Sequence, residues 1–171
     1  HATSKIRKEE DLLKITSMGF RGEALASIAA ISRVDLVTRN INENIGTHVK
    51  VENGEVILKE EAASTVGSRI EIRDVFYNVP ARFKFLKKDF TEAGYIEDVI
   101  TRIALANPQI SIKYINNGKQ VLHTSGNGDL RKTIYDIFGK EVYENVIEIK
   151  YELNNIKLTG MIGMPLVSRS T

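Results

Sequence analysis

The chain has 171 residues and a formal net charge of +2, and its 42% hydrophobic and 27% charged content is that of an ordinary globular protein. This near-neutral charge gives no general reason to expect nucleic acid or an acidic membrane as a partner. The absence of cysteine excludes disulfides, thiolate metal sites and a cysteine nucleophile. No apolar run approaches the ~20 residues of a bilayer span, and we expect no signal peptide.

The N-terminal part of the chain is predicted to contain two helices. Residues 1–18 are expected to form a polar loop with a short helix around residues 8–15, which Ser4 could cap. Residues 22–31 are apolar or small on nearly every side, and this pattern predicts a helix that is buried.

Four strands are predicted next from the alternation of apolar and polar residues. Asn53-Gly54 between the second and third strands is a strong signal for a two-residue hairpin turn. Ile70 and Ile72 are expected on one face of the fourth strand. The predicted strands cover residues 32–39, 47–52, 55–60 and 68–75.

The remainder of the chain is predicted to combine helices with two further hairpins, whose turns are Asn117-Gly118 and Asn154-Asn155. Long helices together with hairpin-rich sheet give an α+β fold class. Because residues 125–129 resemble a linker, we expect a first domain over 1–126 and the opening of a second over 127–171. The expected helices cover residues 81–88, 91–106 and 130–138, and the strands cover 109–115, 119–124, 146–153 and 157–162.

Residues 19–25 read Gly-Phe-Arg-Gly-Glu-Ala-Leu and lead directly into the alanine-rich helix. Backbone N–H groups at such a helix start form an anion site, so the pattern indicates a phosphate and hence a nucleotide. The alternative is a glycine-rich turn that enters a core helix without any ligand, and spacing alone does not separate the two. Glu23 would compensate the helix dipole, while Arg21 would either reach a phosphate or remain solvated.

The other polar motifs are less specific. Residues 1–5 offer two hydroxyls and an ammonium to a phosphate, and a solvated loop is the alternative. Residues 78–82 read as a turn that begins a helix. His1, His48 and His123 are isolated in sequence, so we assign no metal site and see no hydrolase signature. A basic run is either a solvated helix face or a contact for nucleic-acid phosphates; its members are Arg82, Lys84, Lys87 and Lys88.

Three motifs together carry a resemblance to a known family. They are His-Ala-Thr-Ser-Lys-Ile at residues 1–6, Gly-Phe-Arg-Gly-Glu-Ala-Leu-Ala-Ser-Ile at 19–28, and Phe-Tyr-Asn-Val-Pro-Ala-Arg-Phe-Lys-Phe-Leu at 76–86. In this order and at these separations they closely resemble the MutL family of DNA mismatch-repair ATPases. The resemblance covers essentially the whole chain and is strongest over residues 1–106.

The resemblance implies a two-layer α/β sandwich of the type shared by gyrase, heat-shock-90, histidine kinases and MutL (the GHKL ATPases). A mobile lid would cover the nucleotide, and a transducer domain like domain 2 of ribosomal protein S5 would follow. It implies that Thr3, Ser4 and Lys5 belong to the lid side of the ATP site. The phosphate-binding turn and helix start would be Arg21, Gly22, Glu23, Ala24 and Leu25. Gly67 and Ser68 match a Gly-Thr pair of the family, with serine keeping the hydroxyl.

Several family residues have no counterpart in this chain. The general-base glutamate, the magnesium-binding asparagine and the adenine-binding residues would lie upstream of His1, and the transducer lysine would lie beyond Thr171. We therefore expect a piece of a longer protein, with no catalytic or metal-binding residue of its own and no measurable ATP hydrolysis by itself.

The resemblance also implies what the parent protein does. ATP with Mg²⁺ would order the lid and join two N-terminal regions into a homodimer, which couples mismatch recognition by a MutS-type protein to downstream repair. DNA binding would be independent of sequence, without a membrane partner, in the bacterial cytoplasm. The alternatives are a non-catalytic scaffold that binds DNA or protein, and another GHKL ATPase such as a topoisomerase subunit, against which residues 76–82 argue.

Overall fold

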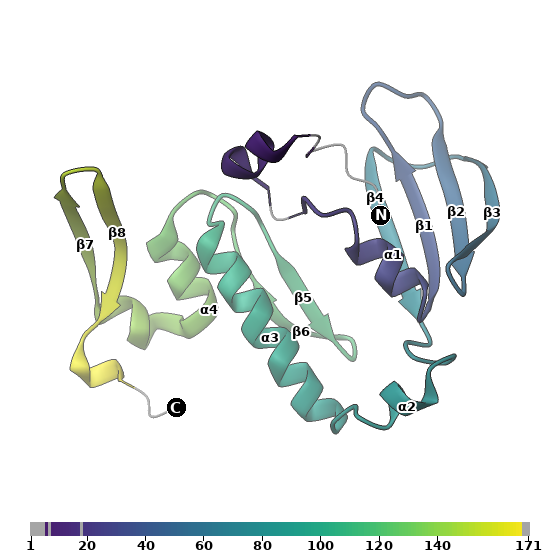
Figure 1. Cartoon of the computed structure of the whole chain (residues 1–171). Coiled ribbons are helices and arrows are strands. Elements are labelled where there is room, and N and C mark those ends of the chain that lie inside the picture. Colours follow the sequence, from purple (N-terminus) through teal and green to yellow (C-terminus); the bar gives the residue numbers. More distant parts are fainter. Residues whose placement is uncertain (1–5, 7, 18, 169–171) are drawn as a thin grey trace. The chain divides into compact units, whose positions relative to one another are not determined.

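The computed structural model describes residues 6, 8–17 and 19–168 (Figure 1). The chain forms two compact units, His1–Leu86 and Lys87–Thr171. The predicted domain boundary between residues 126 and 127 lies inside the second unit and stays a prediction. Ser4, the predicted cap, lies outside the described residues. Among the residues described, no helix is long and apolar enough to cross a membrane.

The two N-terminal helices are shorter than predicted. The first is a 3₁₀ helix at Glu9–Lys14, and the backbone N–H of Lys8 before it donates to the Asp11 carboxylate at 3.0 Å. The second, α1, spans Ala24–Ala29, because Gly22 has a φ of +69° that no helix tolerates. The predicted burial is wrong: α1 contains no buried residue.

A four-stranded antiparallel sheet forms the rest of the first unit, in the order β3-β2-β1-β4. The predicted hairpin between β2 and β3 is confirmed, with Asn53 and Gly54 both at positive φ as this turn type requires. All four predicted strands are confirmed within two residues at each end. They are β1 (Arg33–Arg39), β2 (Gly46–Glu52), β3 (Glu55–Ala62) and β4 (Gly67–Arg73).

One face of this sheet is apolar. The register pairs Val34 with Ile72 and Leu36 with Ile70, so these side chains share a face, as alternation predicted for the two isoleucines. Val34 is buried, and since α1 packs against β1, α1 covers this face near Val34. Ile70 and Ile72 each remain 43% exposed. The helix therefore covers only part of the apolar face.

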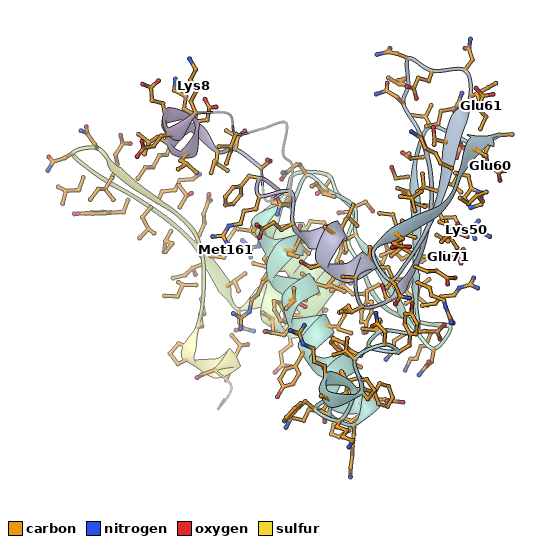
Figure 2. All side chains as sticks on the ribbon, turned by 45° about the vertical axis from the view of Figure 1, so that its right-hand side comes forward. Lys8, Lys50, Glu60, Glu61, Glu71 and Met161 are labelled. Carbon is orange, nitrogen blue, oxygen red and sulfur yellow. The ribbon has the colours of Figure 1, made fainter. Side chains whose placement is uncertain are left out.

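The opposite face carries charged side chains, including those of Lys50, Glu60 and Glu71 (Figure 2). His48 on β2 lies between Asp35 on β1, at 2.9 Å from Nε2, and Glu60 on β3, at 3.2 Å from Nδ1. His48 has no partner close in sequence, and its carboxylate partners come from the neighbouring strands. Burial alone would raise the pKa of Asp35, but the hydrogen bond and charge of His48 and the charge of Lys50 lower it. Such cross-strand pairs favour this register.

A cluster of polar side chains (Asn53, Tyr77 and Asn78, the Asn78 cluster) joins α1 to the β2–β3 turn. Asn78 Nδ2 donates to the Ala30 carbonyl at 2.9 Å and to Asn53 Oδ1 at 2.8 Å. Tyr77 donates its hydroxyl proton to the same Asn53 oxygen at 2.9 Å. The motif at residues 76–82 therefore ties the C-terminal end of α1 to the sheet. The helix predicted to follow is only the short α2, Pro80–Phe83, with Pro80 in its first turn.

The second unit contains two long helices and two hairpins. The predicted helix 130–138 is confirmed: Gly139, with φ +81° and ψ −174°, is not helical and kinks α4, and a second short helical segment follows it to residue 144. The predicted hairpins are confirmed, although the first strand begins later than expected. The elements are α3 (Asp89–Ala106), β5 (Lys113–Asn116), β6 (Lys119–His123), α4 (Leu130–Glu144), β7 (Val146–Leu153), β8 (Ile156–Gly163) and a 3₁₀ helix at Pro165–Val167.

Residues 125–129 pack closely within the second unit. The Ser125 N–H donates to the Asp136 carboxylate at 3.0 Å. Gly126 has a φ of +69°, and a Cβ there would lie 2.8 Å from the Cα of Ser111 and closer still to its nitrogen. The segment is therefore a tightly held connection to α4.

The β7–β8 hairpin is an amphipathic two-stranded ribbon (Figure 1). Alternation places apolar side chains on one face, where cross-strand partners include Tyr151 with Leu158 and Leu153 with Ile156. These four side chains are each more than half exposed. The other face carries polar residues such as Glu148 and Lys150.

We expect Asn78→Ala to lower the free energy of unfolding by about 1–3 kcal/mol, because two hydrogen bonds that hold α1 are lost. Tyr77→Phe is the matched control. It removes one hydrogen bond to Asn53 but keeps the ring 4.7 Å from the Arg33 guanidinium, so about 1 kcal/mol is expected. Urea unfolding followed by circular dichroism measures both. An Asn78→Ala loss no larger than that of Tyr77→Phe would contradict the assigned role of Asn78.

We expect Gly126→Ala to destabilise the second unit by about 2–5 kcal/mol, since the left-handed backbone and the contact with Ser111 both oppose a side chain. Gly128→Ala separates the two effects: Gly128 also has a positive φ, +82°, but has nothing within 4 Å of an added Cβ. Its expected cost is about 1–2 kcal/mol. Equal losses in thermal or urea unfolding would show that residues 125–129 do not pack as described.

Candidate functional site

The turn at residues 19–25 has a left-handed glycine shortly before a short helix. Gly22 is left-handed at φ +69°, and the regular helix begins only at Ala24. The first N–H groups of the helix, from Ala24 to Ala26, have no acceptor inside it, since the hydrogen bond from Ser27 N–H to the Glu23 carbonyl at 2.9 Å follows them. Residues 21–25 are exposed, so a ligand can reach these groups.

The length of α1 limits what its dipole contributes. With six residues, α1 aligns fewer peptide dipoles than the predicted 22–31 helix would. Attraction of an anion therefore depends on the N–H groups of the turn and on the charge of Arg21. The Arg21 guanidinium lies 5.7 Å from the centre of the Phe20 ring. Glu23 occupies the N-cap position, where its carboxylate suits the positive end of the helix.

Ser68 lies at the start of β4, beside a pocket. The β3–β4 connection and the neighbouring part of β1 enclose about 480 Å³, lined by Val37 and residues 62–69. The Ser68 hydroxyl lies 2.7 Å from that of Thr38, its direct partner on β1. Gly67 before it has a φ of +121°, which a side chain would rarely adopt.

The turn and Ser68 belong to the same side of the first unit. Ser68, Ile70 and Ile72 are spaced two residues apart along β4 and therefore lie on one face of the sheet. Ile72 pairs with Val34 on β1, so Ser68 lies on the same face as Val34. Only residues 30–32 separate α1 from β1, so α1 runs back over the sheet with its N-terminus toward the end where β4 begins (Figure 1). Arg21 and Gly22 lie just before α1, and Ser68 lies at the start of β4. Thr3, Ser4 and Lys5 lie outside the described residues.

Thr38 is a hydrogen-bond partner of Ser68 that the sequence did not reveal. Nothing in its neighbourhood marks it, because its relation to Ser68 depends on the pairing of β1 with β4, 30 residues apart in sequence. Alternation of both strands would have placed the two hydroxyls on one face if the register had been known.

The other predicted features give no second site. Within residues 6, 8–17 and 19–168, no group of three or more His, Cys, Asp or Glu side chains is arranged to hold a metal ion. The basic residues at 82, 84, 87 and 88 are exposed, which fits either alternative.

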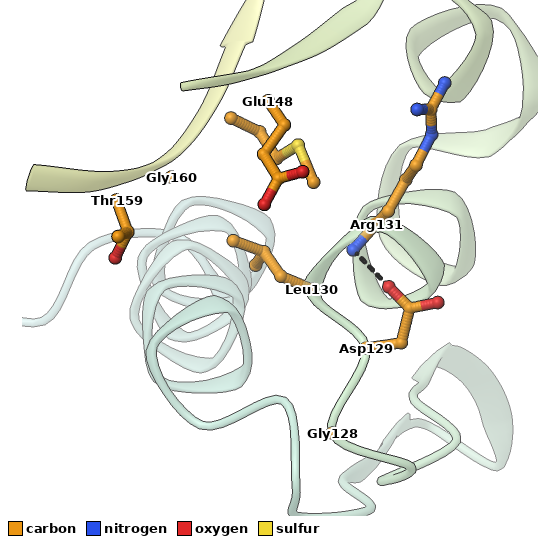
Figure 3. A pocket seen from close by; sticks show the side chains of 8 residues that line it. Gly128, Asp129, Leu130, Arg131, Glu148, Thr159 and Gly160 are labelled. Carbon is orange, nitrogen blue, oxygen red and sulfur yellow. Dashed lines mark hydrogen bonds between the residues drawn. The ribbon is translucent and has the colours of Figure 1, made fainter. Parts of the chain in front are cut away.

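A pocket of about 460 Å³ lies between the start of α4 and the β7–β8 ribbon (Figure 3). The carboxylate of Asp129 accepts hydrogen bonds from the backbone N–H groups of Arg131 and Lys132 at 2.8 and 3.1 Å. Asp129 therefore caps the N-terminus of α4.

Comparison of the sequence with family models gives no match. Curated relatives do match. The chain is 47% identical over 169 residues to the DNA mismatch repair protein MutL of Agathobacter rectalis, and this alignment covers 99% of the chain and 26% of that protein. It is 49% identical over 158 residues to MutL of Caldanaerobacter subterraneus subsp. tengcongensis, and this alignment covers 92% of the chain and 27% of that protein. The chain thus spans about a quarter of the length of these relatives.

Solved structures have the same fold. The Aquifex aeolicus MutL ATPase domain complexed with ADP superposes with a TM-score of 0.69 at 29% identity, covering 85% of this chain and 56% of that one. A second structure of that ATPase domain gives 0.68 at 26% identity, over 96% of this chain and 58% of the other. Together with three motifs in the expected order, these similarities establish that the chain belongs to the MutL family of DNA mismatch-repair proteins and has the α+β fold of its ATPase region.

Proposed function

We propose that this chain supplies the phosphate-binding part of the ATP site of a mismatch-repair ATPase. The observation that carries the proposal is the turn at residues 19–25, where a left-handed Gly22 precedes exposed N–H groups at the start of α1. The ADP complex of the related Aquifex domain supports it. A nucleotide fits the donors that the chain offers, which are backbone N–H groups, a guanidinium and a hydroxyl.

Each residue has a distinct part in this proposal. The N–H groups of Gly22 to Leu25 donate to phosphate oxygens, and Arg21 adds a positive charge close to them. Ser68 offers its hydroxyl to the nucleotide from the start of β4. Thr3, Ser4 and Lys5 would contact the nucleotide from the lid side. ATP itself supplies the phosphoanhydride bond that water cleaves.

We assign no catalytic residue to the chain. Attack of water on a phosphate needs a general base, which commonly contributes about 10²–10⁴-fold to the rate. The resemblance to the family assigns that base, the Mg²⁺ ligand and the adenine contacts to residues outside 1–171. The contribution of this chain is therefore to bind and orient phosphates.

The activity of the whole protein follows from the family. We propose that ATP with Mg²⁺ brings two N-terminal regions together, an order–disorder switch driven by the terminal phosphate. The dimer would couple a MutS-type protein to downstream repair and would bind DNA through its phosphates without sequence preference. A cytoplasmic location belongs to the same proposal.

Gly22→Ala tests the phosphate turn in the full-length protein. An alanine at a φ of +69° strains the backbone by about 1–2 kcal/mol. The turn relieves this strain by changing its conformation, which moves its N–H groups. We expect ATP·Mg²⁺ to bind about tenfold more weakly, as measured by isothermal titration calorimetry.

Gly118→Ala is the control for that experiment. It imposes the same backbone strain, at φ +77°, in the β5–β6 turn of the second unit, with nothing within 4 Å of the added Cβ. ATP affinity should be unchanged in this variant. Wild-type affinity in Gly22→Ala would refute the phosphate turn, and a wild-type protein that does not bind ATP·Mg²⁺ would refute the proposed function as a whole.

A further inference from the structure

Four consecutive carbonyl groups at the C-terminal end of α1 accept hydrogen bonds from outside the helix. Carbonyls at the end of a helix have no partner within it, so such donors determine how firmly that end is held. The first of the four, the Ile28 carbonyl, accepts from the hydroxyl of the fully buried Ser32 at 2.6 Å. The carbonyls of Ala29, Ala30 and Ile31 accept from Gly54 N–H, Asn78 Nδ2 and Phe76 N–H at 3.0, 2.9 and 2.7 Å.

Asn78 differs from the other distant donors because its donor is a side-chain amide. Both of its N–H groups are used, one on the Ala30 carbonyl at 2.9 Å and one on Asn53 Oδ1 at 2.8 Å. The reverse orientation of the amide would place its oxygen against two acceptor oxygens, so the network fixes the direction of the amide. The bond to α1 therefore depends on the side chain at this position.

The backbone that presents these donors departs from its local preference. Phe76 has a φ of +67°, a left-handed conformation that a bulky residue rarely adopts, and Asp74 has a φ of +53°. The N–H of the same Phe76 donates to the Ile31 carbonyl. Such conformations persist where the surrounding contacts enforce them, and they occur preferentially at sites where geometry serves a function. Residues 74–78 are thus held in position against the end of α1.

The opposite end of α1 carries the exposed N–H groups of the proposed phosphate turn. The helix has six residues and no buried side chain, so burial does little to oppose a tilt. Its length is about 9 Å, and a tilt of about 10° about the C-terminal end would move the N-terminal end by about 1.5 Å. N–H···O hydrogen bonds require a separation of about 2.7–3.2 Å, so this movement would break a bond to a phosphate oxygen.

We infer that Asn78 is a positioning residue for the phosphate groups of a nucleotide: its amide holds the C-terminal end of α1, so that the N–H groups at the N-terminal end keep their direction toward the phosphates. Asn78 itself does not contact the ligand. The inference rests on the proposed function, because it assumes that a nucleotide binds at the turn at residues 19–25.

A double-mutant cycle on the full-length protein tests the inference, with ATP·Mg²⁺ affinity measured by isothermal titration calorimetry. We expect Asn78→Ala to bind about 3–10-fold more weakly. Asn78→Asp keeps the shape but faces the Ala30 carbonyl with an acceptor, so its loss should be at least as large. In a Gly22→Ala background, Asn78→Ala should weaken binding by less than about twofold more, because the turn that Asn78 orients is already displaced.

A second measurement reports the direction of the N–H groups rather than the affinity. In protein labelled with ¹⁵N-alanine, saturating ATP·Mg²⁺ should move the amide proton resonance of Ala24 downfield, because this N–H donates to a phosphate oxygen. At the same degree of saturation, the Ala24 shift should be smaller in Asn78→Ala. A loss of stability alone would leave the shift of the bound, folded protein unchanged.

His48→Gln is the control for a general loss of stability. His48 contacts Asp35 and Glu60 on the sheet face opposite α1, so its substitution disturbs the first unit without altering the bonds to α1. The ATP affinity of this variant and its Ala24 shift should equal those of wild type. Thermal unfolding of every variant measures the accompanying change in stability.

The outcomes separate the inference from the proposed function. If wild type binds ATP·Mg²⁺ and Asn78→Ala either binds equally well or keeps the full Ala24 shift at saturation, the role of Asn78 is refuted and the proposed function stands. Losses that multiply fully in the double variant, or an equal loss in His48→Gln, also refute it. If wild type does not bind ATP·Mg²⁺, or if Gly22→Ala binds like wild type, the proposed function itself fails.

Discussion

The hydrogen bonds of Asn78 are the constraint on which the first unit depends. A helix of six residues with no buried side chain gains little from the hydrophobic effect, and on its own it is too short to be stable in water. Its position comes from polar contacts at its C-terminal end, where Asn78 bonds the Ala30 carbonyl and Asn53. Because the candidate phosphate turn is the other end of the same helix, a side-chain amide 56 residues beyond Gly22 helps to hold it, together with the backbone hydrogen bonds from Gly54 to Ala29 and from Phe76 to Ile31.

The sequence predicted the strands better than the helices, for a physical reason. Strand alternation and the Asn-Gly turns are local signals, and β1 to β4 follow them closely. Helix ends depend on the backbone of single residues. Gly22 delays the start of α1, and Gly139, whose backbone is not helical, divides α4 into two helical segments. The prediction that α1 is buried is wrong. The composition of a helix shows how much apolar surface the helix could bury, but β1 covers only one side of α1.

The candidate site also combines features that the sequence predicts with features that it does not. Arg21, Gly22 and Ser68 stand in contiguous motifs that the sequence displays, before α1 and at the start of β4. The hydrogen bonds of Thr38 with Ser68 and of His48 with its carboxylate partners join neighbouring strands, so they depend on register, which no single segment encodes. Motifs in the sequence thus indicate which residues could contact a ligand. The pairing of strands shows which side chains lie next to those residues.

The first unit has little hydrophobic core to support this arrangement. Among its described residues, Val34 is the one buried apolar side chain of the sheet, and Ile70 and Ile72 remain partly exposed on the same face. A ligand that binds only the folded form stabilises that form. At a concentration 100 times its dissociation constant, such a ligand contributes about 2.7 kcal/mol. A nucleotide held by the turn before α1 and by Ser68 on β4 would bridge two elements that few apolar contacts join. Phosphate binding and ordering of the first unit would therefore be one event, which is the coupling that an ATP-dependent switch requires.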